Sequence, residues 1–205
     1  MRAGHTLPAI AAIALFAPRF GHAQGVPEPP SSARLWLGGD LAVSPVGTER
    51  YTTTARTPLS SALNTMYSAG LLLDYRVSSV VSVGLAPAVI FNWGNVMLLG
   101  LPARLTVGGE FASGTRLYAF ATAGYEHSIG LPSDLDPGGE ESDAGFIAGA
   151  GAGVAFRIAP RLVLNGELGY QFHALTERTF DDGYFDIPVR LHCLVLSLGL
   201  VAPFR

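Results

Sequence analysis

Three sets of side chains in this chain of 205 residues could take part in chemistry. His127 and Ser128 are adjacent, and a histidine that reaches a serine hydroxyl can activate it as a nucleophile. His173 and His192 are possible metal ligands, and Cys193 directly follows the second. The segments 127–144 and 176–188 together hold nine carboxylates and one arginine, a density that attracts divalent cations.

The spacing of these residues argues against a conventional site. Consecutive side chains of a regular strand point to opposite faces, so His127 and Ser128 would meet only at a bulge or where a loop starts. The histidines and Cys193 do not have the spacing of a metal site. The stretch "DLDPGGEESD" has Gly138 where an EF-hand loop needs its third ligand. We therefore assign no catalytic, cofactor-binding or metal-ligating residue, and we interpret the acidic segments as solvated loops, with a weak calcium or partner site as the alternative.

The composition is unusual for a water-soluble domain. Hydrophobic residues make up 49% of the chain and charged residues only 14%, well below the usual quarter. All 13 basic residues are arginine, and without Arg2 and Arg19 the remaining 11 face 16 acidic residues, which argues against nucleic acid as a partner. The single cysteine excludes an internal disulfide framework.

The first residues have the pattern of an export signal. "LPAIAAIALFA", residues 7–17, is too short to span a bilayer as a helix, follows Arg2, and precedes the small-residue cleavage pattern "GHA" at 21–23. We predict a signal peptide over residues 1–23, a Pro-rich periplasmic leader over 24–32 and one β-domain over 33–205. An uncleaved membrane anchor is the alternative, and no cysteine lies near the cleavage site to accept a lipid.

Alternating apolar and polar residues, bounded by turn residues, divide the domain into an even number of strands. The eight predicted strands are Ala33–Val43, Asn64–Tyr75, Val80–Phe91, Val96–Val107, Arg116–Glu126, Gly145–Ile158, Leu162–Leu175 and Val189–Phe204.

The links between these strands alternate in length. Three long polar links, 44–63, 127–144 and 176–188, would lie at one end of an up-and-down barrel, and the short links "RVSS" and "APR" at the other. Short periplasmic turns and long extracellular loops are typical of outer-membrane barrels. The short link "NWGN" is an exception, because it would lie at the long-loop end.

The two faces of the strands differ sharply in polarity. In the strand 162–175 apolar residues such as Leu168 alternate with polar residues such as Glu167. A charged side chain that faces lipid near the midplane costs a few kcal/mol, so the polar face should line a lumen. For the strand 116–126 we expect Leu117, Ala119, Ala121, Ala123 and Tyr125 to face outward. The residues expected to point into the lumen are Asp40, Asp74, Arg104, Glu126, Arg157, Glu167 and Gln171.

Aromatic residues are expected near both rims of the apolar wall, as in membrane proteins generally. In "YSAGLLLDY" an outward tyrosine marks each end of the apolar face. The aromatic residues placed toward the long-loop end are Tyr67, Phe91, Trp93, Tyr125, Phe146 and Phe172, and those toward the other end are Tyr75, Phe156 and Phe204.

The closing stretch "LHCLVLSLGLVAPFR" ends in alternating apolar residues with Phe204 next to the last position. Together with "DYRVSSVVSVGL" and "LYAFATAGYEH", it resembles the small eight-stranded bacterial outer-membrane barrels typified by OmpX and the OmpA transmembrane domain. The resemblance implies an all-β, eight-stranded antiparallel up-and-down transmembrane barrel with both termini in the periplasm. It also implies a monomer inserted into the outer membrane by the barrel assembly machinery.

The function expected for such a chain is a structural or adhesion-like role without enzymatic activity or a cofactor. The long loops would contact an extracellular partner, and outer-membrane lipid and lipopolysaccharide would surround the wall. One alternative is an enzyme of the lipid A 3-O-deacylase type, which the layout resembles and in which His127 and Ser128 would act. Another is a soluble exported barrel of the lipocalin type, although Trp36 precedes Gly38 and Gly39 where those proteins have Gly-x-Trp.

Overall fold

The computed structural model describes residues 34–52, 58–92, 96–111, 114–130, 142–180 and 184–204. The predicted signal peptide 1–23 and leader 24–32 lie outside these ranges. No helix that could cross a membrane occurs among the described residues. The strands are β1 (Leu35–Thr52), β2 (Pro58–Ala62), β3 (Met66–Arg76), β4 (Val81–Leu85), β5 (Ala88–Asn92), β6 (Val96–Glu110), β7 (Thr115–Gly130), β8 (Ser142–Ala159), β9 (Leu162–Phe180) and β10 (Tyr184–Phe204).

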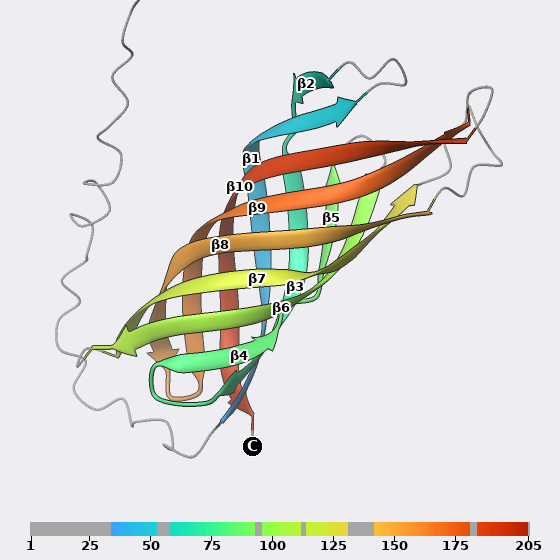
Figure 1. Ribbon diagram of the computed structural model, residues 1–205. Coiled ribbons are helices and arrows are strands. Elements are labelled where there is room, and N and C mark those ends of the chain that lie inside the picture. Colours follow the sequence, from blue (N-terminus) through green and yellow to red (C-terminus); the bar gives the residue numbers. More distant parts are fainter. Residues whose placement is uncertain are drawn as a thin grey trace, which may run out of the picture.

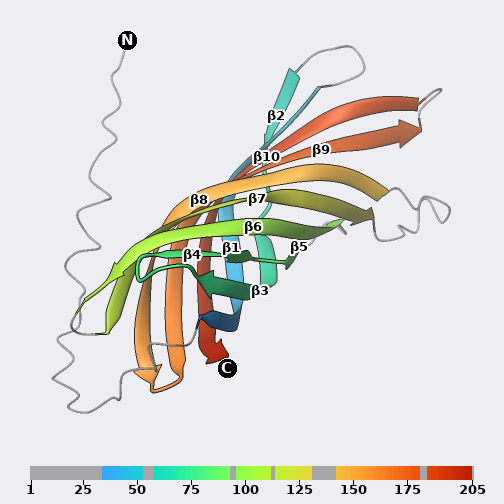
Figure 2. The same ribbon diagram turned by 60° about the horizontal axis from the view of Figure 1, so that its bottom comes forward.

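The strands form one closed antiparallel ring (Figures 1 and 2). β1 pairs with β10 on one side and with β3 on the other, which closes the barrel. β4 and β5 occupy one position in the ring, since both lie between β3 and β6. β2 pairs only with the far part of β1. The described strands therefore occupy eight positions, and the predicted eight-stranded up-and-down barrel is confirmed.

The predicted strand Val80–Phe91 is interrupted at Ala86 and Pro87. Proline has no N–H to donate to a neighbouring strand, which is the physical reason for the break. Two backbone hydrogen bonds hold the interrupted segment in the ring: Ala86 N–H donates to Pro102 O at 2.9 Å, and Leu71 N–H donates to Pro87 O at 2.9 Å.

The strands extend much further into the predicted loops than the sequence indicated. β1 runs on to Thr52, and β9 and β10 stay paired to Phe180 and Tyr184, so that they form a long hairpin beyond the ring (Figure 1). The predicted links 44–63 and 176–188 are therefore largely strand. Their polar composition predicts loops, but a strand that projects into water has no apolar face to bury, so the same composition also suits a strand.

We call the two ends of the barrel the short-turn end and the long-loop end. The short-turn end carries the turns after β3, β6 and β8 and the end of β10. The turn after β6 is closed by a hydrogen bond from Phe111 N–H to Thr115 O, and Gly114 takes the positive φ of 74° that the turn requires.

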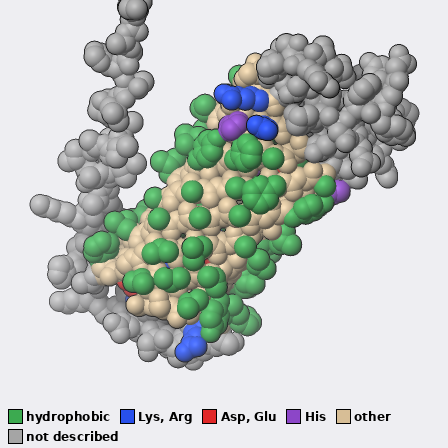
Figure 3. All heavy atoms as spheres, viewed as in Figure 1, with side chains coloured by type: hydrophobic (Ala, Val, Ile, Leu, Met, Phe, Trp, Pro, Cys, Tyr) green, Lys and Arg blue, Asp and Glu red, His purple; other side chains and the backbone are tan. Residues whose placement is uncertain are grey.

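The outer wall is apolar, as predicted (Figure 3). Leu71, Leu198 and Tyr125 each keep more than half of their surface exposed, at 59%, 60% and 56%. The five residues of β7 predicted to face outward are all exposed. Near the long-loop end Tyr67 and Phe91 stack with their ring centroids 6.0 Å apart. Trp93 lies outside the described residues.

The interior is divided into two halves of different character. Toward the short-turn end it is lined by charged residues, whereas the long-loop half is filled by buried apolar side chains. These are Met66, Ile90, Leu98, Ile147, Val189, Leu191 and Cys193, which we call the apolar plug. The sequence predicts charge within the wall, but it does not predict this plug.

Close packing of the strands leaves no room for a side chain at some glycines. A Cβ on Gly124 of β7 would lie 2.4 Å from both Leu101 O and Pro102 Cα, which are backbone atoms that cannot move aside alone. A Cβ on Gly109 of β6 would meet nothing within 4 Å. We expect Gly124→Ala to destabilise the barrel by about 1–3 kcal/mol, a typical overpacking effect, and Gly109→Ala to leave it unchanged. Heat-modifiable gel migration and urea unfolding in detergent measure both, and equal stabilities would contradict this packing.

Candidate functional site

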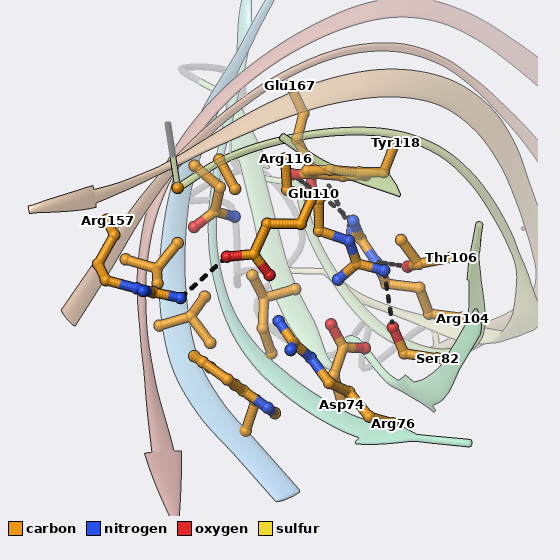
Figure 4. A pocket seen from close by; sticks show the side chains of 17 residues that line it. Asp74, Arg76, Ser82, Arg104, Thr106, Glu110, Arg116, Tyr118, Arg157 and Glu167 are labelled. Atoms are coloured by element: carbon orange, nitrogen blue, oxygen red, sulfur yellow. Dashed lines mark hydrogen bonds and ion pairs between the residues drawn. The ribbon is translucent and has the colours of Figure 1, made fainter. Parts of the chain in front are cut away.

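The polar half of the lumen collects the charged side chains of the barrel. β6 contributes Arg104 and Glu110, which are an even number of residues apart and therefore face the same side of the strand. β9 contributes Glu167. The other charged residues that line this half are Asp74 and Arg76 of β3, Arg116 of β7 and Arg157 of β8 (Figure 4).

Arg104 and Glu167 form the centre of this cluster. Arg104 Nη1 donates to Glu167 Oε2 at 3.1 Å, and Nη2 donates to Oε1 at 2.5 Å, so the guanidinium grips both carboxylate oxygens. The hydroxyl of Tyr118 donates to Oε1 at 2.7 Å. The two charged side chains are only 6% and 8% exposed. Such a bidentate pair fixes both side chains in direction as well as in distance.

Further contacts hold the Arg104 guanidinium in place. Its Nε donates to Thr106 Oγ1 at 3.3 Å, and its Cζ lies 4.5 Å from the ring centroid of Phe120. Thr106 belongs to the same strand as Arg104, and Phe120 belongs to the neighbouring β7. The guanidinium is therefore held by β6 and β7 as well as by Glu167.

A second layer of the cluster lies nearer the short-turn end. Arg157 Nη2 donates to Glu110 Oε1 at 2.9 Å, and Arg116 Nη2 donates to Ser82 Oγ at 3.5 Å. The Cζ of Arg76 lies 4.3 Å from the ring centroid of Trp36. The Arg157–Glu110 pair is more open than the central pair, with side chains 14% and 40% exposed.

The charges of the polar half balance. Four carboxylates face four guanidiniums inside one narrow lumen, so each charge has opposite charges nearby to offset the loss of water. The carboxylates are Asp40, Asp74, Glu110 and Glu167, and the guanidiniums are Arg76, Arg104, Arg116 and Arg157.

The central pair separates two small cavities in the described barrel. One, of about 60 Å³, lies toward the short-turn end, and the other, of about 70 Å³, lies toward the apolar plug. Leu72, Arg104 and Glu167 line both. Each holds a few water molecules at most, because one water needs about 10–15 Å³ by this measure. The lumen is thus packed with side chains.

A buried polar pair lies next to the apolar plug. His173 Nδ1 and Glu126 Oε2 are 2.7 Å apart, and both side chains are fully buried. The other two polar atoms of this pair, Glu126 Oε1 and His173 Nε2, make no hydrogen bond within the described protein. Glu126 lies inside, as its strand alternation predicts, but its pairing with His173 could not be predicted, because the two residues are 47 positions apart.

The other residues singled out from the sequence are dispersed. His192 lies on the outer wall, where its Nδ1 contacts the Tyr170 hydroxyl, and Cys193 is buried in the plug. β7 pairs with β6 and β8 without a register shift at His127 and Ser128, so the backbone there has no bulge to re-aim either residue. Among the described residues no group of three His, Cys, Asp or Glu could hold a metal ion.

The side chains of the acidic segments 127–144 and 176–188, predicted to be solvated loops, lie largely outside the described part of the chain. Residues 131–141 and 181–183 lie outside the described ranges, as do the side chains of 128–143 and 176–188. A calcium or partner site there stays a prediction.

Solved structures share this fold at low sequence identity. Neisserial surface protein A (NspA) matches with a TM-score of 0.55 at 15% identity, over 83% of this chain and 97% of its own. The outer membrane protein OprG from Pseudomonas aeruginosa matches with a TM-score of 0.53 at 11% identity, over 87% and 100%. No protein-family model and no curated protein matches the sequence. The chain therefore has the transmembrane β-barrel fold of outer-membrane proteins.

The central ion pair predicts a specific mutational pattern. Arg104→Met leaves the carboxylate of Glu167 buried without its counter-charge, and Glu167→Met does the same to Arg104; each should destabilise the barrel by about 3–5 kcal/mol. The double variant Arg104→Met/Glu167→Met buries no unpaired charge and should recover a large part of that loss. Urea unfolding of the barrel in detergent micelles measures all three.

The matched control for this prediction is Arg157→Met. It removes an ion pair whose carboxylate side chain is 40% exposed, so we expect the free energy of unfolding to fall by about 1 kcal/mol or less. If the two central single variants were as mild as this control, or if their effects simply added in the double variant, the central pair would not organise the lumen.

Proposed function

We propose that this chain is a non-enzymatic barrel of a bacterial outer membrane, which presents its long-loop end to extracellular partners. The observation that carries the proposal is the filled interior. An ion-paired cluster occupies one half of the lumen and the apolar plug occupies the other, so the barrel serves as a rigid support.

The outer surface supports a place in the membrane. Its apolar residues would be unfavourable in water, whereas the hydrocarbon of a bilayer accepts them. The two similar solved structures are a surface protein and an outer-membrane protein by name, which agrees with this placement.

The long-loop end supports a role in contact. The paired extensions of β1 with β2 and of β9 with β10 project from the ring and would hold the segments 44–63 and 176–188 in a fixed direction. A rigid scaffold that positions variable connecting segments is a common arrangement for binding. We propose these two segments and 127–144 as the contact surfaces.

A loop replacement tests the proposal. Gram-negative cells that express the protein should adhere to cultured epithelial cells, and replacing residues 132–141 by Gly-Ser-Gly should reduce adherence to that of cells with an empty vector. Heat-modifiable migration should be unchanged, because these residues belong to none of the described strands. The matched control replaces Ser78 and Ser79, in a short turn at the opposite end, by two glycines and should adhere like the parent protein.

The same cells distinguish this role from an enzymatic one. Mass spectrometry of their lipid A should show no lost acyl chain. A lost chain that reappears with His127→Ala would contradict the proposal in favour of a deacylase, and adherence that survives the loop replacement would contradict the contact surface.

A further inference from the structure

A β-bulge in β1 changes which side chains face the membrane. From Trp36 to Ser44 the even-numbered residues point inward, and Ser44 is 7% exposed. The pairing of β1 with β10 then shifts between Val43 and Val46, and Val46 is 64% exposed. A bulge inserts one extra residue and so exchanges the two faces of the strand beyond it. As a result Arg50, which the simple alternation would place inside, is on the outer wall.

The bulge places two arginines directly opposite each other. Arg50 of β1 pairs in register with Arg190 of β10, and both side chains are exposed. Directly opposite side chains in a sheet have Cβ atoms about 5 Å apart, and like charges at that distance destabilise the pair. Within the described part of the chain neither guanidinium makes an ion pair or a hydrogen bond. An anion between them would turn this repulsion into binding.

The arginine pair lies just above the apolar wall. On β10 the outward residues from Phe204 to Leu194 are apolar, and ten residue steps on a strand tilted by about 40° span about 25 Å, the height of the apolar band of a membrane barrel. His192 and Arg190 come next on the same face. Figure 3 shows arginine side chains beside a histidine where the apolar surface ends.

Aromatic side chains mark this level as the membrane interface. The ring centroid of Phe172 lies 5.1 Å from that of His192, and the hydroxyl of Tyr170 contacts His192 Nδ1. Aromatic rings with a polar partner are typical of the level of the lipid headgroups. The two arginines therefore lie where the phosphate groups of lipids would be.

We propose that Arg50 and Arg190, with His192 beside them, bind the phosphate group of a phosphorylated lipid in the outer leaflet. Guanidinium groups bind phosphate oxygens in pairs, which makes arginine the preferred residue for this chemistry. A shallow apolar groove of about 780 Å³ lies lower on the outer wall and would accept the acyl chains of the same molecule. It is lined by Leu41, Ala152, Leu168, Leu196 and Leu198, among others. The inference rests on the proposed membrane placement, but it does not depend on the adhesive role.

Native mass spectrometry of the purified, folded protein in detergent tests this site. The probes are lipid A that carries both phosphates, the same lipid A with its phosphates removed, and inorganic phosphate. We expect the intact lipid to bind, and we expect Arg50→Gln/Arg190→Gln to weaken its binding about tenfold or more, because the charge-assisted hydrogen bonds to its phosphate are lost. The dephosphorylated lipid should bind the parent protein as weakly as the intact lipid binds the double variant.

The matched control is Arg161→Gln, which removes an exposed arginine from the turn after β8, at the opposite end of the barrel. It should bind intact lipid A like the parent protein. Equal binding of intact and dephosphorylated lipid, unchanged binding by the double variant, or inorganic phosphate bound as tightly as the lipid would each overturn the proposal. Adherence of cells carrying the double variant is a separate readout, so failure of this site is distinguishable from failure of the proposed function.

Discussion

The Arg104 guanidinium cannot reach lipid without a large loss of free energy, so it must find its counter-charge across the lumen. Glu167 supplies it from a strand 63 residues further along the chain, and Tyr118 fixes the same carboxylate from a third strand. Such a contact can form only when the sheet curves so far that β6 and β9 face each other across the lumen. The interaction that neutralises the interior therefore also specifies which strands lie opposite one another. In a flat sheet β6 and β9 would be three strand spacings apart, about 14 Å, too far for Arg104 and Glu167 to pair.

The division of the lumen connects this constraint with the role of the molecule. The polar half is electrically balanced and holds only small cavities, while the apolar plug fills the half nearest the long loops. An interior in which side chains fill both halves gives the projecting hairpins of β1–β2 and β9–β10 a stiff base. The fully buried pair of Glu126 and His173 beside the plug adds a polar contact between β7 and β9 in that region.

Much of this architecture could be predicted from the sequence, because strand periodicity carries the information. The alternation of Leu168 with Glu167 and the run of outward residues on β7 gave the correct faces without knowledge of any contact. Contacts between distant strands carry no such signal, so the pairing of Arg104 with Glu167 could not be predicted. The sequence does not predict the plug, because inward residues such as Leu98 and Ile147 belong to stretches that are apolar on both faces.

Other differences have local causes that were present in the sequence. Pro87 marks the interruption between β4 and β5, since it cannot donate a backbone hydrogen bond. The bulge after Val43 contains Pro45, and it reverses the orientation of Arg50, which pattern reading alone would place inside. For the polar hairpin extensions the composition predicts loops, because nothing in it distinguishes a solvated strand from a solvated loop.

The most direct test of the account is a spin-label accessibility scan along β9 in lipid vesicles. Nitroxides would be placed one at a time on cysteines from Leu164 to Phe172, with Cys193→Ala as the background. The even-numbered positions should be readily relaxed by oxygen, which dissolves in the bilayer, and the odd-numbered positions, including Glu167, should be protected. Uniform accessibility, or the opposite phase with position 167 exposed to lipid and position 168 protected, would contradict the apolar wall and the charged interior together.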